Sequence, residues 1–78
     1  MLKIFSKDAC PACRMSKKWL VENGIEFEEI LVDVRNDTET LEKLRSLGFM
    51  AFPVIVPNGD DFVKAWSGYR LDKLRALK

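Results

Sequence analysis

The sequence of 78 residues is informative first through what it lacks. It contains no histidine, which excludes the usual imidazole general base and nucleophiles of the Ser–His or Cys–His type. It has only two cysteines, too few to supply all four ligands of a structural zinc site. Its net charge of +1 argues against general nucleic-acid binding, which requires a strongly basic surface.

Long hydrophobic runs are also missing. The longest stretch without a charged or strongly polar residue is residues 47–57, whereas a membrane-spanning helix needs roughly 18–20 apolar residues. The short apolar start of the chain is soon followed by Lys7 and Asp8, so we expect no secretory signal. These absences predict a cytoplasmic protein that does not associate with membranes, in a reducing compartment where structural disulfides are rare.

What is present fits one small α/β domain spanning residues 1–78. The hydrophobic content of 47% is too high for a disordered chain. Hydrophobic patterning predicts strands at residues 2–5, 27–32, 53–56 and 62–66, and helices at 11–23, at 38–47 and after Tyr69. A helical crossover makes the first two strands parallel, and a tight Asn-Gly turn at residues 57–60 makes the last two antiparallel. The predicted order is β-α-β-α-β-β-α, with a four-stranded mixed sheet flanked by three helices.

The predicted helices have recognisable ends and apolar stripes. Pro11 suits the first position of a helix, with Cys10 as its N-cap, and Gly24 suits its end. Asn36 followed by Glu39 resembles a capping box for the second helix. The expected core-facing residues are Ala12, Met15, Trp19 and Leu20 in the first helix, Leu41, Leu44 and Leu47 in the second, and Leu71, Leu74 and Leu77 in the third.

The Cys10-Pro11-Ala12-Cys13 motif has three possible interpretations. A structural disulfide would close a very short loop, worth only about 2 kcal/mol, between residues that one helical turn already brings together. Half of a zinc or iron–sulfur site would need a second chain to complete the ligands. A redox-active dithiol needs nothing beyond the two thiols, and we favour it.

The dithiol interpretation assigns a role to each cysteine. Cys10 as N-cap would accept hydrogen bonds from the free N–H groups of Ala12 and Cys13, and the positive helix end would favour its thiolate. Residues 1–24 carry five basic and two acidic side chains, which adds positive potential, and Lys7 is a candidate contributor. We therefore expect Cys10 to be the exposed nucleophile and Cys13 the buried resolving thiol.

The whole chain resembles the thioredoxin-fold family, and its short length points to the glutaredoxin branch. The resemblance rests on the N-terminal strand, the Cys10–Cys13 motif at a helix start, and Pro53 opening a late strand. It implies a cis peptide bond before Pro53 and a loop facing the cysteines, in which Phe52 pairs with the substrate backbone. The last motif, Trp66-Ser67-Gly68-Tyr69-Arg70, is similar to the signature of the NrdH redoxins, although Leu71 stands where proline usually follows.

The resemblance to NrdH redoxins implies a function and its partners. It implies a protein-disulfide reductase that delivers electrons to the large subunit of class Ib ribonucleotide reductase and is recharged by thioredoxin reductase with NADPH. We also expect a monomer with no bound cofactor and no metal, and partner-binding residues at Phe52, Pro53, Trp66, Ser67, Gly68 and Tyr69.

Two other functions stay open, as do simpler roles for these residues. A conventional glutathione-dependent glutaredoxin is the enzyme alternative, although Ala51 and Phe52 replace the Thr-Val that usually precedes this proline. A dimeric iron–sulfur or zinc carrier is the non-enzyme alternative. Trp66 and Tyr69 could also be plain core residues, and Gly68 a turn glycine.

Overall fold

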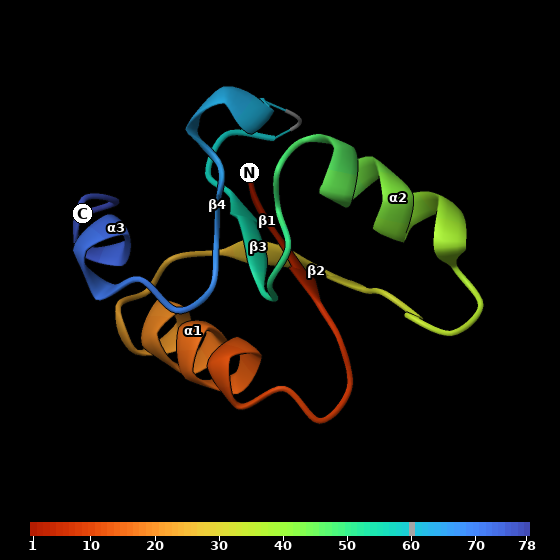
Figure 1. Cartoon of the computed structure of the whole chain (residues 1–78). Helices are drawn as coiled ribbons and strands as arrows, with labels where there is room; N and C mark the ends of the chain where they lie inside the picture. Colours follow the sequence, from red (N-terminus) through yellow and green to blue (C-terminus); the bar gives the residue numbers. More distant parts are fainter. Residues whose placement is uncertain (60) are drawn as a thin grey trace.

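The computed structural model describes residues 1–59 and 61–78, which form a sheet with helices on both faces (Figure 1). The strands are β1 (Leu2–Ser6), β2 (Phe27–Leu31), β3 (Val54–Val56) and β4 (Trp66–Ser67). The helices are α1 (Pro11–Glu22), α2 (Thr38–Ser46) and α3 (Leu71–Arg75), with a short 3₁₀ helix, η1 (Phe62–Lys64), before β4. The predicted order of elements is therefore confirmed, with η1 added.

The sheet is mixed, with strand order β2-β1-β3-β4. Strand β1 runs parallel to β2, so that Ile4 lies opposite Glu29. It runs antiparallel to β3, where Ile4 lies opposite Ile55, and β3 in turn pairs with β4 in the antiparallel sense. The crossover through α1 permits the parallel pair, because parallel strands need a long connection.

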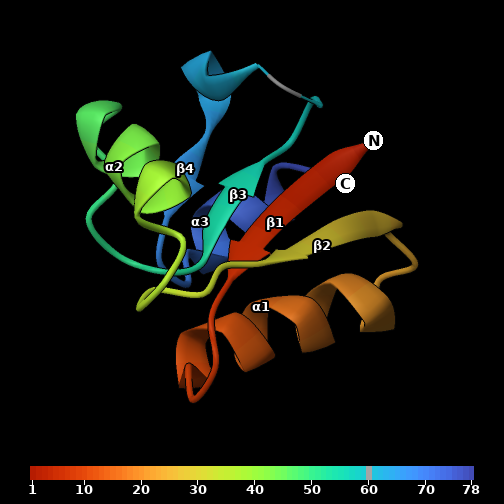
Figure 2. The ribbon, with the colours of Figure 1, turned by 90° about the vertical axis from the view of Figure 1, so that its right-hand side faces the viewer.

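Two apolar clusters pack on opposite faces of the sheet, because successive side chains of a strand point to opposite faces. Leu2 and Ile4 of β1 join Leu20 of α1 and Leu74 of α3 in the first cluster. The second cluster is built from Leu44 of α2 with Val54 and Val56 of β3, and Phe5 packs against it. Figure 2 accordingly shows α1 and α2 on opposite sides of the sheet.

The strand predicted at residues 62–66 is wrong over most of its length. Asp61 accepts a hydrogen bond from the Val63 N–H at 3.0 Å and caps η1, and this local bond competes with strand pairing. The ring of Phe62 lies 6.2 Å from that of Phe5, which fixes the turn on the core. Of the predicted strand, Trp66 alone pairs with β3, as the first residue of the short strand β4 (Trp66–Ser67). The turn predicted at residues 57–60 includes Asp60, which lies outside the described residues.

The N-cap of α2 differs from the predicted one by one residue. The N-cap is Asp37, whose carboxylate accepts the Thr40 N–H at 3.1 Å. Asn36 does not cap the helix, because its side-chain amide donates to Asp33 at 2.9 Å instead. The predicted helix from Thr38 is thus confirmed, and the predicted capping box is wrong.

The buried stripes of the helices are narrower than the sequence pattern indicates. In α1 the buried residues are Cys13, Ser16 and Leu20, whereas Met15 is 51% exposed. In α2 only Leu44 is buried, and Leu47 at the C-cap is 45% exposed. The face of a helix that turns inward depends on the rotation of the whole helix against the sheet, which local spacing does not specify.

Candidate active site

The two cysteines lie at the start of α1 and form a disulfide. Cys10 is the N-cap with an extended backbone, and Pro11 occupies the first turn. The Cys13 N–H donates to the Cys10 sulfur at 3.2 Å, and the two Cα atoms are 5.2 Å apart. The predicted cap is confirmed, although the structure shows the bond from Cys13 and not a second one from Ala12. A sulfur at this place faces the positive end of the helix, and no acidic side chain lies in the first turn.

Both cysteines are largely covered, which corrects the expectation of an exposed nucleophile. Cys10 is 6% exposed and Cys13 is 1% exposed. Cys10 is still the more accessible of the two. The residue before it, Ala9, adopts a left-handed backbone conformation with φ 53°, which is uncommon for residues other than glycine. The order of accessibility therefore agrees with the predicted roles.

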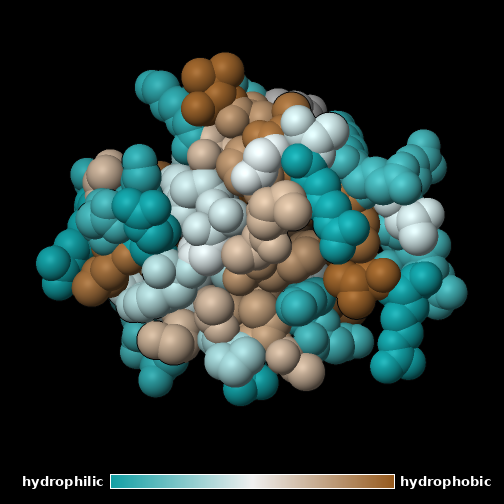
Figure 3. Space-filling view, viewed as in Figure 1, coloured by the Kyte–Doolittle hydropathy of each residue, from teal (hydrophilic) through white to brown (hydrophobic). Residues whose placement is uncertain are grey.

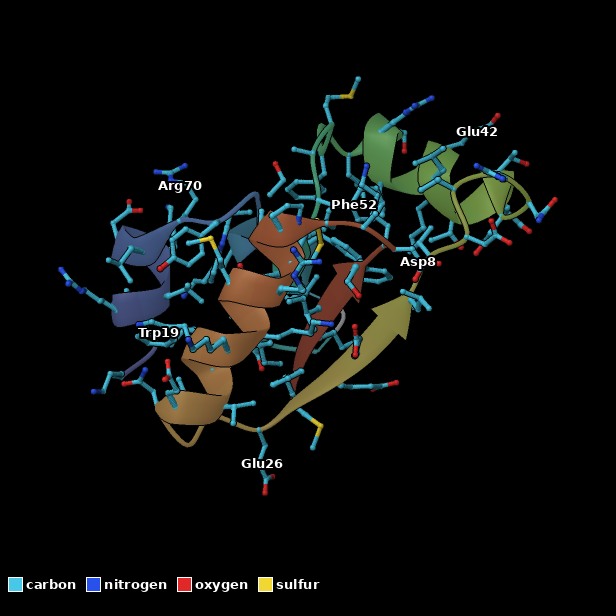
Figure 4. The ribbon with its side chains drawn as sticks, turned by 90° about the horizontal axis from the view of Figure 1, so that it is seen from below. Asp8, Trp19, Glu26, Glu42, Phe52 and Arg70 are labelled. Atoms are coloured by element: carbon cyan, nitrogen blue, oxygen red, sulfur yellow. A yellow bond between two sulfur atoms is a disulfide. The ribbon has the colours of Figure 1, made fainter. Side chains whose placement is uncertain are left out.

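The proline loop lies close to the loop before Cys10. The Phe52–Pro53 peptide bond is cis, as the resemblance implied, and Pro53 is fully buried. The Lys7 ammonium lies 5.7 Å from the centre of the Phe52 ring, within the range of a cation–π contact. Figure 4 shows Phe52 close to the loop that carries Asp8. The fold thus brings Phe52 into contact with Lys7, which belongs to the loop that precedes Cys10.

The segment Trp66–Tyr69 is held to the same proline loop by a backbone hydrogen bond. The Gly68 N–H donates to the Pro53 carbonyl at 2.8 Å, and Gly68 has φ 84°, a conformation that favours glycine. Trp66 is only 7% exposed and belongs to the first core cluster, and Tyr69 packs against that cluster. The core role considered for these two aromatics is therefore present in the structure.

Three polar residues that the sequence patterns did not single out are linked by hydrogen bonds, and two of them, Lys17 and Glu29, line a cavity together with the cysteines. The Glu29 carboxylate accepts hydrogen bonds from the buried Ser6 hydroxyl and from the Lys17 ammonium, each at 2.7 Å. These bonds, first that from Lys17 and then that from Ser6, lower the pKa of the Glu29 carboxyl below its ordinary value. The only sequence signal is that Lys17 lies one helical turn beyond Cys13.

Two hollows adjoin the site. A cavity of about 340 Å³ is lined by both cysteines together with Lys17 and Glu29. A separate groove, also of about 340 Å³, lies against Phe52 and carries the cations Lys7 and Arg45. In Figure 3 an apolar strip runs down the middle of the visible face between polar flanks. Met50, in the loop between α2 and β3, is 75% exposed.

Within residues 1–59 and 61–78, no group of three or more His, Cys, Asp or Glu side chains is placed to hold a metal ion. Among the helices of this same part of the chain, none is long and apolar enough to cross a membrane.

The comparisons with known proteins agree with the geometry. Residues 2–63 match the Glutaredoxin family. The chain is 44% identical over 77 residues to the glutaredoxin-like protein NrdH of Lactococcus lactis subsp. lactis (strain IL1403), covering 99% of both. It is 34% identical over 76 residues to NrdH of Escherichia coli (strain K12), covering 97% of this chain and 86% of that one.

Solved structures give the same assignment. The NrdH-redoxin of Escherichia coli superposes with a TM-score of 0.78 at 31% identity, covering 99% of this chain and 93% of the other. A glutaredoxin from Archaeoglobus fulgidus superposes with a TM-score of 0.75 at 28% identity, covering 97% and 83%. The sheet topology and the Cys10–Cys13 disulfide at a helix start define a thiol–disulfide oxidoreductase of thioredoxin-like fold. The chain belongs to the Glutaredoxin family and, within it, to the NrdH redoxins.

Proposed function

We propose that this redoxin reduces a disulfide of class Ib ribonucleotide reductase and is itself re-reduced by thioredoxin reductase with NADPH. The observation that carries the proposal is the full-length similarity to NrdH proteins, one of which is described as having a thioredoxin-like activity profile. The Trp66–Arg70 motif supports it, because the Gly68 N–H of this motif donates a hydrogen bond to the carbonyl of Pro53 in the proline loop. We further propose that the protein acts as a cytoplasmic monomer without a bound cofactor.

The proposed reaction uses only the two thiols. The Cys10 thiolate attacks a sulfur of the substrate disulfide, and the other substrate sulfur leaves with the electron pair and takes up a proton. Cys13, as its thiolate, then attacks the Cys10 sulfur of the mixed disulfide. The bond to the substrate breaks, the second substrate thiol leaves, and the Cys10–Cys13 disulfide forms. Two electrons pass from the redoxin to the substrate. In the proposed cycle, thioredoxin reductase then transfers two electrons from NADPH to the Cys10–Cys13 disulfide and so restores both thiols.

The assignment of roles is tested by exchanging each cysteine for serine. Cys10→Ser should abolish disulfide reduction, whereas Cys13→Ser should accumulate a mixed disulfide through Cys10, seen by mass spectrometry. A mixed disulfide through Cys13 in the Cys10→Ser protein, with no trapping in the other variant, would reverse the roles.

The reductant is tested by direct comparison of two recycling systems. The protein should support ribonucleotide reductase turnover with thioredoxin reductase and NADPH, and poorly with glutathione and glutathione reductase. The opposite preference would contradict the proposal and support a glutathione-dependent glutaredoxin. One observation favours that second function, because the groove beside Phe52 carries Lys7 and Arg45, which suit a thiol bearing carboxylates.

A further inference from the structure

A lysine lies one helical turn beyond the buried thiol. Residues four apart on a helix share a face, with about 5–6 Å between their Cβ atoms, so Lys17 stands beside Cys13. Cys13 is 1% exposed, whereas the Lys17 side chain keeps 30% of its surface. Both residues line the cavity of about 340 Å³ next to the disulfide.

The lysine is held in this place by the neighbouring strand. Its ammonium pairs with the Glu29 carboxylate at 2.7 Å. Glu29 lies opposite Ile4 in the sheet, on the face that α1 covers. Its carboxylate also accepts the hydroxyl of Ser6 at 2.7 Å, and Ser6 is 1% exposed. A lysine is otherwise free to extend into water, so this anchor keeps a positive charge at the cavity.

Positive charge is in excess around this cavity. The loop before Cys10 contributes Lys7 and Asp8, and β2 contributes Glu29. Helix α1 contributes Arg14 and Lys17. Three cations thus face two anions in the neighbourhood of the two sulfurs, and a thiolate formed there is favoured.

Glu29 is unsuited to take the proton of a thiol. Its hydrogen bonds from Lys17 and Ser6 lower the pKa of the carboxyl, whereas an ordinary thiol titrates at about 8.5. Transfer of a proton from sulfur to this carboxylate is therefore strongly uphill. The Lys17–Glu29 pair therefore acts through the positive charge of the Lys17 ammonium and not through proton transfer to Glu29.

We propose that Lys17 is a positioning residue for the resolving step, in which its anchored ammonium stabilises the thiolate of Cys13. The inference rests on the resolving role proposed above for Cys13. The proton of the Cys13 thiol leaves to water, and the thiolate attacks the Cys10 sulfur of the mixed disulfide. The Cys10–Cys13 bond forms as the bond to the substrate sulfur breaks, and that sulfur leaves with the electron pair.

The test follows the two thiols separately with a chromogenic nitrobenzoate disulfide. The reduced protein releases one coloured thiolate when Cys10 attacks and a second when Cys13 resolves the adduct, and stopped-flow absorbance separates the two phases across pH. The variants are Lys17→Met, which removes the charge, and Lys17→Arg, which keeps it. Lys18→Met is the matched control, because Lys18 is the exposed neighbour that carries the same charge.

We expect Lys17→Met to slow the second phase about three- to tenfold near neutral pH and to move its profile to higher pH by roughly half to one unit, since a nearby opposite charge favours ionisation. Lys17→Arg should stay within about twofold of the wild type by the same argument, and Lys18→Met should match the wild type. Equal effects of Lys17→Met and Lys18→Met would overturn the inference, as would a Lys17→Arg protein as slow as Lys17→Met.

The assay contains no reductase, so its outcome is independent of the proposed partners. A slow second phase in Lys17→Met supports the inference even if recycling by thioredoxin reductase fails. A second phase that persists in Cys13→Ser would instead remove the resolving role of Cys13, and the inference with it.

Discussion

Replacing Ser16 with alanine should make this protein more stable. Ser16 lies in the middle of α1 with no exposed surface. Its hydroxyl has no hydrogen-bond partner within the described residues. A buried polar group without a partner loses its hydration and gains nothing in return. Most substitutions destabilise a protein, so an increase in the free energy of unfolding is a demanding expectation.

The magnitude follows from three contributions. Removing a buried unpaired hydroxyl recovers about 1–3 kcal/mol of desolvation free energy. Alanine is the better helix former, by about 0.5 kcal/mol. The void left by one oxygen, on the order of 10 Å³, costs about 0.2 kcal/mol at roughly 24 cal/mol per Å³. The sum is a gain of about 1–3 kcal/mol, and a domain of this size gains roughly 4–8 °C in Tm per kcal/mol.

The assay is equilibrium urea unfolding and a thermal scan of the disulfide form, followed by circular dichroism. Ser46→Ala is the matched control, because the exposed Ser46 hydroxyl donates to the Lys43 carbonyl at 2.7 Å near the end of α2. Its free energy of unfolding should change by about 0.5 kcal/mol or less. A Ser16→Ala protein that is less stable than the wild type would refute the reasoning, because it would show that the hydroxyl has a partner.

Two further predictions concern the helix cap and the charged network. Asp37→Ala should lower the free energy of unfolding, measured in urea, by about 1 kcal/mol through loss of the N-cap bond to Thr40. An equal loss in Asn36→Ala would contradict this assignment and identify Asn36 as the cap. Glu29→Gln should lower stability at neutral pH by about 1 kcal/mol or less, because the pair with Lys17 is partly exposed. The folded-state pKa of Glu29 is lowered, so its contribution is present above the unfolded pKa and is lost as pH falls through the folded value. Urea unfolding across pH should therefore show the two proteins converging in acid, and a difference that persists there would contradict this assignment.

Local patterns were sufficient for most of the fold and for the chemical centre. Pro11 after Cys10 predicted the start of α1, because both the missing N–H and the fixed φ of proline fit a first turn. The helix between residues 5 and 27 predicted a parallel pair of strands, since a short turn cannot make one. These inferences hold because each depends on residues that are near one another in the chain.

The errors arose where two local options competed. Asn36 and Asp37 are both good caps, and Asp33 decides between them by binding the Asn36 side chain. Residues 62–66 have the composition of a strand, yet Asp61 caps a turn there and Phe62 packs against Phe5. Neither outcome is visible in the hydrophobic pattern, because two of the deciding contacts are polar hydrogen bonds, between Asp33 and Asn36 and between Asp61 and Val63, and the third, Phe62 against Phe5, comes from a distant strand.

The sequence by itself determined the class of protein and the two sulfurs that carry its chemistry, since a Cys-x-x-Cys at a helix start is a local arrangement. Only the tertiary structure decided what surrounds those sulfurs. The pairing of β1 with β2 places Glu29 beneath α1, although it lies twelve positions beyond Lys17 in the chain. The rotation of α1 buries Cys13 and Ser16 and leaves Met15 exposed. Register and helix rotation are settled by packing across the whole domain, so no short stretch of sequence contains them.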